Sequence, residues 1–213
     1  MSKHIFITAT NTGIGKTYTT IKLMHALTEK GYRVGVIKPI ETGVEDAPSD
    51  GMLLLQALKK LNPAAWAMDI DDVVPVKMEL PAAPFVAKGD SVIDWDAIDT
   101  AFQTMEAICD VCLIEGAGGL LVPIDASTDM IDLIPRFSAK ALLVSHCELG
   151  CMNDLRLSLE ALERRKIPHE WVLNCRIDMK DFAQISQPYF DSVYPGWRTL
   201  QKDLEQLCDT LLL

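Results

Sequence analysis

The sequence lacks the features that mark membrane-spanning and DNA-binding proteins. It has no uninterrupted apolar run of the roughly 18 residues that a membrane-spanning helix needs, and a single Lys precedes its first short apolar stretch. Basic residues are few: 20 Lys and Arg stand against 30 Asp and Glu, for a net charge of −10. Because duplex DNA is bound by clustered Lys and Arg, binding of nucleic acid is disfavoured. We expect a cytoplasmic protein that binds neither nucleic acid nor membranes.

The cysteines lack the pattern of a disulfide framework or of a zinc site. Most lie inside apolar, strand-like stretches, which favours buried thiols in a reducing compartment. Cys109 and Cys112 have the spacing of half a zinc site, but no second Cys-x-x-Cys follows, so we interpret them as residues leading into a core strand. His146, Cys147 and Cys151 could ligate a metal, although the apolar residues before His146 favour a strand end instead.

The chain does contain enough apolar material for one core, since 49% of its 213 residues are hydrophobic. No repeat, low-complexity tract or linker divides it, so residues 1–213 are predicted to form a single domain. Short apolar runs alternate with longer helical segments, which is typical of a predominantly parallel α/β sheet with helices on both faces. The predicted strands are 5–8, 34–37, 111–114, 141–144 and 171–173; the predicted helices are 18–30, 51–61, 93–108, 129–137, 152–166 and 200–211.

Two segments carry more specific expectations. Segment 75–84 contains several prolines, which exclude a regular helix or a central strand, so we expect a loop over the sheet edge or a substrate lid. In the predicted helix 152–166, Leu155, Leu159 and Leu162 share one face. That spacing is typical of packing against the chain's own core.

The most specific local pattern follows the first predicted strand, where residues 9–17 read Ala-Thr-Asn-Thr-Gly-Ile-Gly-Lys-Thr. An apolar strand, a glycine-bearing turn and a helix opening at Gly-Lys-Thr predict a phosphate-binding loop. Backbone N–H groups would surround the phosphates, Lys16 would reach the terminal oxygens, and Thr17 would hold Mg²⁺. Thr10 stands where the standard pattern has glycine. The order of strand, loop and helix favours a phosphate site over a plain surface turn.

Polar residues follow the other predicted strands, at the edge where α/β sheets bind ligands. Lys38 precedes Pro39 and would point into the same cleft as Lys16, unless it is a solvated strand-end residue. Glu115 stands where nucleotide-hydrolysing folds place an acidic group near Mg²⁺. If it is buried it needs an ionic partner, and the alternative is an exposed loop residue. Asp50 begins a predicted helix, where an N-cap role is a sufficient explanation.

Taken in order, these motifs resemble the dethiobiotin synthetase family. The shared elements are the loop at 9–17, Lys38-Pro39, Ser49-Asp50, Ile114-Glu-Gly-Ala-Gly-Gly119 and Leu149-Gly-Cys-Met-Asn153. The resemblance implies a P-loop fold and a step of biotin biosynthesis in which 7,8-diaminopelargonate, CO2 and ATP give dethiobiotin, ADP and phosphate, with Mg²⁺ as cofactor. It also implies a homodimer. Closing a cyclic urea through a phosphorylated carbamate requires charge neutralisation and alignment more than a protein nucleophile.

The resemblance also implies roles for individual residues. Lys16 and Lys38 would be catalytic, the first on the terminal phosphates and the second on the carbamate and the developing phosphate charge. Mg²⁺ would be held by Thr17, Asp50 and Glu115. The nucleotide would be bound by Thr12, Gly13, Ile14, Gly15, Lys16, Thr17, Tyr18, Asp50, Glu115, Gly116, Ala117, Gly118, Asn174 and Cys175. The diamine would contact Thr42 and, across a dimer interface, Gly150, Cys151 and Asn153.

The chain departs from the family pattern at several positions. Ala9 and Asn11 replace a commoner Gly and Asp, Glu148 stands where Lys is expected, and Cys175 stands where Asp is common. The C-terminal region looks short, with no clear match to the family's base-covering loop, so weak selectivity for the base is expected. The alternative function is a ParA/MinD-like partitioning ATPase. Such proteins place a signature Lys at the position of Asn11 and commonly an Asp at that of Glu115, so this alternative is disfavoured.

Overall fold

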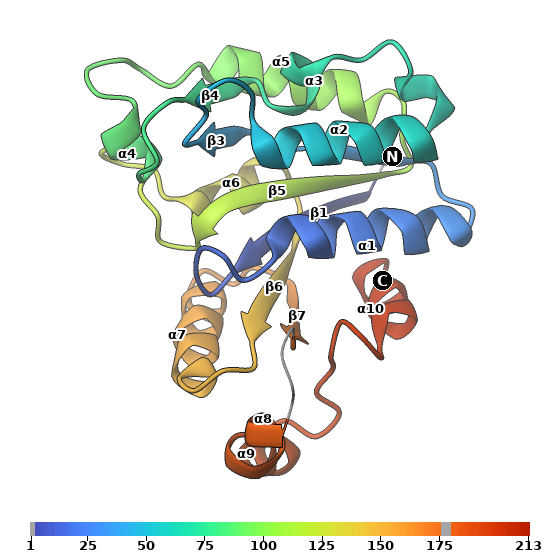
Figure 1. The fold of residues 1–213 in the computed structure, drawn as a ribbon, viewed down its shortest axis with the longest axis vertical. Helices are drawn as coiled ribbons and strands as arrows, with labels where there is room; N and C mark the ends of the chain where they lie inside the picture. Colours follow the sequence, from blue (N-terminus) through green and yellow to red (C-terminus); the bar gives the residue numbers. More distant parts are fainter. Residues whose placement is uncertain (1–2, 176–179) are drawn as a thin grey trace.

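The computed structural model describes residues 3–175 and 180–213 and contains one central parallel sheet (Figure 1). The strand order in the sheet is β2-β5-β1-β6-β7, and each neighbouring pair is parallel. The strands are β1 (Lys3–Ala9), β2 (Val34–Ile37), β5 (Val111–Gly119), β6 (Lys140–His146) and β7 (His169–Asn174). The predicted parallel α/β sheet is therefore confirmed.

Helices connect the strands and pack against them. The first helix, α1 (Lys16–Glu29), contacts β1, β2 and β5, while α5 (Trp95–Glu106) contacts β2 and β5. Farther along the sheet, α7 (Cys151–Arg164) packs on β6, and α10 (Leu204–Leu211) packs on β7 and α1. The other helices are α2 (Ser49–Leu61), α3 (Ile70–Val73), α4 (Pro84–Ala87), α6 (Leu133–Arg136), α8 (Lys180–Ile185) and α9 (Gln187–Val193).

The core lies along the central strands. Every residue from Ile5 to Ala9 in β1 and from Val111 to Gly116 in β5 is buried, so both faces of these strands are covered, as parallel strands require. Leu155, Leu159 and Leu162 of α7 belong to the same core. The packing role predicted for that helix face is confirmed. No helix in the described part of the chain is long and apolar enough to cross a membrane.

Some elements differ from their predicted bounds for identifiable reasons. Strand β5 continues past 114 to Gly119 because its polar end still pairs with β1, where Ala9 lies opposite Gly119. The predicted helix 129–137 is a 3₁₀ turn at Met130–Asp132 followed by the short α6, which contains Pro135. The predicted helix 200–211 begins only at Leu204 because the preceding residues form a turn.

Segment 75–84 is neither a regular helix nor a central strand, as predicted, but it contains a strand that the sequence did not reveal. β4 (Val76–Met78) pairs in parallel with β3 (Ile40–Thr42) in a separate two-stranded sheet. Helix α4 begins at Pro84, a position in the first turn that tolerates proline. The small sheet places Thr42 and segment 81–84 beside the carboxyl ends of the central strands.

Candidate active site at the carboxyl ends of the strands

The loop between β1 and α1 places the N-terminus of α1 at the carboxyl edge of the sheet. Gly15 forms the N-cap with a φ of 99°, a left-handed conformation that glycine adopts without strain. The N–H of Thr10 donates to the carbonyl of Val144 (3.0 Å), which ties the loop to β6. Lys16 Nζ donates to the carbonyl of Gly118 (2.8 Å). The first N–H groups of a helix have no partner within the helix, and beside an ammonium group they suit a phosphate ligand.

Lys16 is a buried lysine whose pKa lies well below the usual value for lysine. Its side chain lies in a pocket where burial, and next the charge of Lys38, lower its pKa to about 8. The carboxylates of Glu115 and Asp50 act in the opposite direction. Two ammonium groups in a poorly solvated site favour an incoming anion.

Lys38, Asp50 and Glu115 form an ion-pair network with hydroxyl groups of α1, in which Lys38 and Glu115 are buried and Asp50 is partly exposed. Lys38 Nζ donates to Glu115 Oε1 at 2.7 Å and to Asp50 Oδ2 at 2.8 Å. Thr17 Oγ1 donates to Glu115 Oε1 (2.8 Å), and Thr20 Oγ1 donates to Glu115 Oε2 (2.7 Å). Glu115 has 0% exposure and Lys38 has 3%. The prediction that a buried Glu115 needs an ionic partner is confirmed.

The network resolves the alternatives left open for Lys38 and Asp50. Lys38 is not a solvated strand-end residue. Burial acts to lower its pKa, but the charges of Glu115 and Asp50 more than offset it, so the pKa of Lys38 is raised. Burial acts to raise the pKa of Asp50, and the Lys38 charge reverses that effect, so this pKa is lowered. The N-cap interpretation of Asp50 is wrong, because Pro48 occupies the N-cap of α2 and the Asp50 side chain pairs with Lys38.

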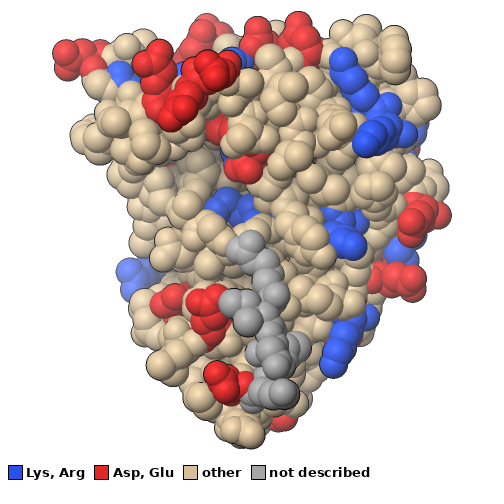
Figure 2. All heavy atoms as spheres, in the orientation of Figure 1, with Lys and Arg blue, Asp and Glu red and all other residues tan. Residues whose placement is uncertain are grey.

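A cavity of about 690 Å³ opens onto this network. In Figure 2, acidic and basic side chains meet in a recess on this face of the molecule, below a row of acidic side chains. Predicted residues from the loop and α1 that line the cavity are Thr12, Gly13, Gly15, Lys16, Thr17 and Tyr18. Those from elsewhere are Lys38, Thr42, Asp50, Ala117 and Gly118. Glu115 and Gly116 are buried in β5.

Several lining residues of this cavity were not predicted from the sequence. Glu41 and Ser49 line it, as do residues 81–84 of the proline-bearing stretch, whose role as a lid stays a prediction. Glu41 stands in the polar stretch after β2, so its position was a usable signal. Its role depends on the start of α2, which the sequence alone did not place beside it.

A second cavity, of about 730 Å³, shares Thr12 and Gly13 with the first and extends toward the ends of β6 and β7. The predicted nucleotide-binding residues Ile14 and Asn174 line it. Asn174 Nδ2 donates to the carbonyl of Ile14 (2.8 Å), and its Oδ1 accepts a bond from Gln201 Nε2 (2.9 Å). Asn174 therefore connects the end of β7 to the phosphate loop.

Helix α8 forms part of the wall of the second cavity through Asp181, Phe182 and Ile185, and Ser186, which follows the helix, also lines it. Helix α8 was not among the predicted helices, because residues 180–185 form only a short helix after the last strand. The expectation of weak selectivity for the base stays a prediction. Residues 176–179, which precede α8, lie outside the described residues.

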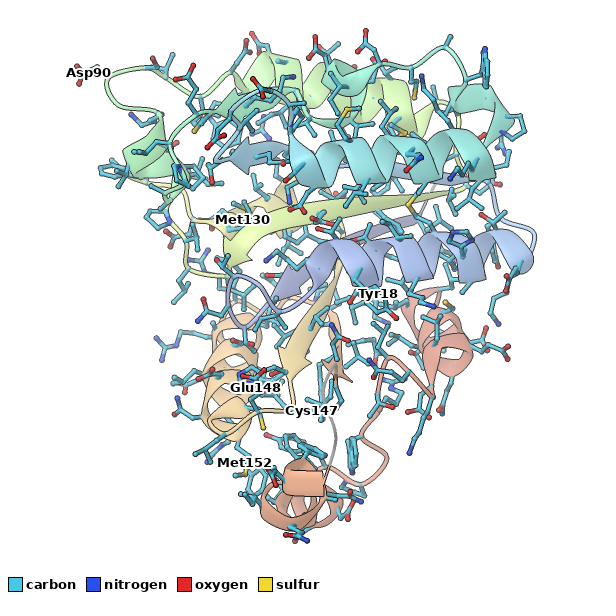
Figure 3. All side chains as sticks on the ribbon, in the orientation of Figure 1. Tyr18, Asp90, Met130, Cys147, Glu148 and Met152 are labelled. Carbon is cyan, nitrogen blue, oxygen red and sulfur yellow. A yellow bond between two sulfur atoms is a disulfide. The ribbon has the colours of Figure 1, made fainter. Side chains whose placement is uncertain are left out.

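Cys147 and Cys175 are disulfide-bonded beside this cavity, with 5.1 Å between their Cα atoms. The expectation of free thiols is wrong for this pair. His146 lies opposite Asn174 in the pairing of β6 with β7, so the residues that follow them come together. Figure 3 shows Cys147 in the connection between β6 and α7.

The remaining described cysteines, Cys109, Cys112, Cys151 and Cys208, are buried free thiols. Cys109 precedes β5 and Cys112 lies in it, as predicted. His146 Nε2 lies 3.2 Å from Asp154 Oδ2. Within residues 3–175 and 180–213, no cluster of three or more His, Cys, Asp or Glu side chains suits a metal ion.

The residues predicted to bind the diamine are divided between two places. Thr42 lines the cavity that contains Lys38. Gly150, Cys151 and Asn153 lie at the N-terminus of α7, where Gly150 is the N-cap and Cys151 is fully buried. Asn153 lines a separate surface groove with Arg156. One copy of the chain therefore does not bring these residues together with Thr42.

Sequence similarity to known proteins covers nearly the whole chain. A family model described as an AAA domain matches residues 3–189. The chain is 42% identical to the ATP-dependent dethiobiotin synthetase BioD of Sulfurovum sp. (strain NBC37-1), over 97% of this chain and 99% of that protein. It is 38% identical to the protein of the same name from Wolinella succinogenes, over 99% and 98% of the two chains.

Solved structures share the fold at much lower sequence identity. A plasmid partition protein from Borrelia burgdorferi aligns with a TM-score of 0.55 at 14% identity, covering 99% of this chain and 96% of that one. The MinD cell division protein of Aquifex aeolicus aligns with a TM-score of 0.50 at 18% identity, covering 98% and 86%. Such identities show the P-loop fold alone, whereas the full-length relatives show the family. The chain belongs to the ATP-dependent dethiobiotin synthetase family.

Proposed function

We propose that this protein converts 7,8-diaminopelargonate, CO2 and ATP to dethiobiotin, ADP and phosphate in biotin biosynthesis. The observation that carries the proposal is the pair of buried lysines at one cavity: Lys16 extends from the phosphate loop, and Lys38 extends from the neighbouring strand end. A ParA/MinD-like function is supported by the shared fold alone. This chain has Asn11 at the position where ParA/MinD-like proteins have their signature Lys. We expect the whole chain, residues 1–213, to act as one domain in the cytoplasm.

The proposed chemistry proceeds in three balanced steps. One amine of the substrate adds to CO2 and loses a proton, which gives a carbamate. A carbamate oxygen attacks the terminal phosphorus of ATP, and ADP leaves. The second amine then attacks the carbamoyl carbon, the bond from that carbon to the phosphate oxygen breaks, and the urea ring closes as the amine's proton passes to the departing phosphate or to water. Negative charge accumulates at the oxygens throughout, so fixed positive charge is the main requirement of the site.

The two lysines suit different parts of this path. Lys16, at the N-terminus of α1, would bind the terminal phosphates together with the backbone N–H groups of residues 13–17. Lys38 would stabilise the carbamate and its phosphorylated form, because its ion pairs with Glu115 and Asp50 keep it charged and hold its position.

The donor set also fits Mg²⁺. Thr17, Asp50 and Glu115 offer one hydroxyl and two carboxylates, and Mg²⁺ prefers oxygen ligands with phosphate oxygens and water completing its shell. Bound Mg²⁺ would neutralise phosphate charge during transfer. Asp50 is the accessible carboxylate of the pair, since its side chain is 43% exposed.

We place the base of the nucleotide in the second cavity, between Asn174 and α8. Cys175 would act there through its backbone, because its side chain is in the disulfide. Asn174 already bonds to Ile14 and Gln201, so its amide has limited capacity to read a base. We therefore expect GTP to compete partly with ATP in binding assays. A strong preference for ATP would contradict this expectation.

The diamine site is proposed to span a homodimer. Thr42 of one copy would face Gly150, Cys151 and Asn153 of the other, with backbone N–H groups at the N-terminus of α7 receiving the substrate carboxylate. Mixing Asn153→Ala chains with Lys38→Ala chains should restore part of the activity, because one site in each mixed dimer would contain neither change. No recovery after demonstrated subunit exchange would rule out a shared site.

The proposed reaction has a direct test. Purified protein should release phosphate from ATP slowly until both 7,8-diaminopelargonate and bicarbonate are present, and mass spectrometry should then detect dethiobiotin. Lys38→Ala should bind ATP normally by calorimetry yet lose most turnover, whereas Lys16→Ala should lose ATP affinity. Equal phosphate release without the diamine would refute the synthetase function, and equal loss of ATP binding in both variants would refute the division of roles.

A further inference from the structure

Glu41 is a buried carboxylate at the edge of the candidate active site whose partners are backbone groups. It lies in the middle of β3, is 5% exposed and lines the cavity that contains Lys38. Its Oε1 accepts a hydrogen bond from the N–H of Asp50 (3.0 Å), and its Oε2 accepts one from the N–H of Gly51 (2.9 Å). Both oxygens thus bind consecutive peptide groups in the first turn of α2.

These contacts replace a cap that α2 cannot make by itself. The residue at its N-cap is Pro48, which makes no side-chain cap hydrogen bond. An N-cap side chain normally accepts from the second or third N–H of its helix, and Glu41 binds both of these groups from a different strand. A carboxylate at this end of a helix is also favoured by the helix dipole.

The close approach of the carboxylate depends on Gly51. A Cβ at this position would lie 3.3 Å from Glu41 Oε2 and 2.2 Å from Cγ2 of Val74. The second distance is a steric clash, so a larger residue would force the first turn of α2 away from Val74 and disturb its contact with Glu41. The sequence thus combines a glycine in the helix with an acidic residue on the strand to hold this turn in place.

The turn that Glu41 holds carries Asp50. The Asp50 carboxylate bonds to Lys38 Nζ at 2.8 Å, and Lys38 bonds in turn to Glu115 at 2.7 Å. Because Glu41 binds the N–H groups of Asp50 and of the next residue, it fixes the backbone from which the Asp50 side chain extends. Both Glu41 oxygens are used in this way, so Glu41 affects the site through Asp50.

We propose that Glu41 is a positioning residue that holds Asp50 in place for the divalent cation bound with the nucleotide. The inference rests on the Mg²⁺-nucleotide site proposed above. Groups that orient metal ligands typically change metal affinity by about 10–100-fold when they are replaced. A cap with a purely structural role would change only the stability of the fold.

The test measures binding of a non-hydrolysable ATP analogue by calorimetry over a range of Mg²⁺ concentrations and in EDTA. Glu41→Gln keeps the size of the side chain but loses one acceptor. Mg²⁺ should increase the affinity for the analogue, and the Mg²⁺ concentration that gives half of this increase should be about tenfold higher in Glu41→Gln than in the wild type. Binding in EDTA should stay near the wild-type value. Glu41→Asp retains the charge on a shorter side chain and should show the same defect; a wild-type response in this variant would overturn the positioning role.

A matched control is offered by Asp94, which caps α5 by accepting a hydrogen bond from the N–H of Ala97 (2.9 Å). Asp94→Asn should lower the melting temperature and leave the Mg²⁺ response unchanged. The effect of Glu41→Gln should also disappear in an Asp50→Asn background, because the two residues act through one carboxylate.

Besides a wild-type response in Glu41→Asp, three results would overturn the inference. The first is a wild-type Mg²⁺ response in Glu41→Gln, and the second is a full additional loss on top of Asp50→Asn. The third is a wild-type protein whose analogue binding does not depend on Mg²⁺, which would refute the proposed metal site and the inference together. The first two leave the proposed synthetase function intact.

Discussion

The contact between Lys38 and Glu115 predicts a specific pattern of stability changes that is independent of catalysis. Replacing Lys38 with Met removes the cation but keeps a long side chain, which leaves Glu115 charged and fully buried. Replacing Glu115 with Gln removes the opposite charge, and Lys38 then keeps only Asp50. Each single change thus leaves a buried charge with fewer partners, whereas the double change removes both charges.

The expected magnitudes follow from the partners that remain. Removing one member of a buried ion pair costs about 3–5 kcal/mol. For Lys38→Met we expect the lower end, about 3 kcal/mol, because Thr17 and Thr20 still donate to Glu115. For Glu115→Gln we expect about 2 kcal/mol, because Asp50 still pairs with Lys38. The double variant should cost about 2 kcal/mol less than the sum of the two single changes.

Urea unfolding of the nucleotide-free variants at pH 7, followed by circular dichroism, measures these free energies. The folded-state pKa of Lys38 is raised above its unfolded value, so the pair contributes its full stability at neutral pH and loses it only in strongly alkaline solution. Arg164→Met is a suitable control, because it removes an exposed ion pair with Glu160 and should cost less than about 1 kcal/mol. Additive effects of the Lys38 and Glu115 changes would refute the coupled buried pair.

Two further changes are predicted from the structure. The pKa of Lys16 is about 8 in the folded protein and 10.5 in the unfolded chain, so between these values the unfolded chain binds the proton and the stability of the fold rises with pH. At pH 7 the charged, buried Lys16 therefore lowers the free energy of unfolding. In EDTA, Lys16→Met should raise this free energy by about 3 kcal/mol at pH 7, and the gain should disappear as the pH approaches 10.5. A difference between the two proteins that does not change with pH would contradict this. Alkylation of the denatured, unreduced protein should label the four cysteines Cys109, Cys112, Cys151 and Cys208, and prior reduction should add Cys147 and Cys175; six labelled thiols without reduction would disprove the disulfide.

Much of the fold was predictable because its strands are contiguous apolar runs. The stretch after Val34 and the stretch after Val111 contain few polar residues, which marks strands that are covered on both faces. The order of strand, glycine-bearing loop and helix at residues 9–17 was equally readable, since it depends on residues that are adjacent in the chain. Predictions of this kind succeed because the physical cause is local.

Features that depend on distant segments could not be predicted. Cys147 and Cys175 each follow a strand, but their pairing depends on β6 lying beside β7. Glu41 was visible as an acidic residue after β2, but its role depends on where α2 begins. Pro48 was a usable sign, because a helix that starts after proline has no side-chain cap of its own and must find an acceptor elsewhere.

The contrast between the two lysines connects the stability of the site with its proposed chemistry. Lys38 has two carboxylate partners and stays charged across the physiological range, so its position and charge are available before any substrate charge develops. Lys16 bonds to a carbonyl and has a pKa of about 8, so its charge is costly in the free protein. An arriving phosphate would raise that pKa and remove the cost. Part of the nucleotide's binding energy would therefore come from relieving an unfavourable lysine. The local charges of Lys16 and Lys38, and not the net charge of −10, would then decide whether a polyanion binds at this site.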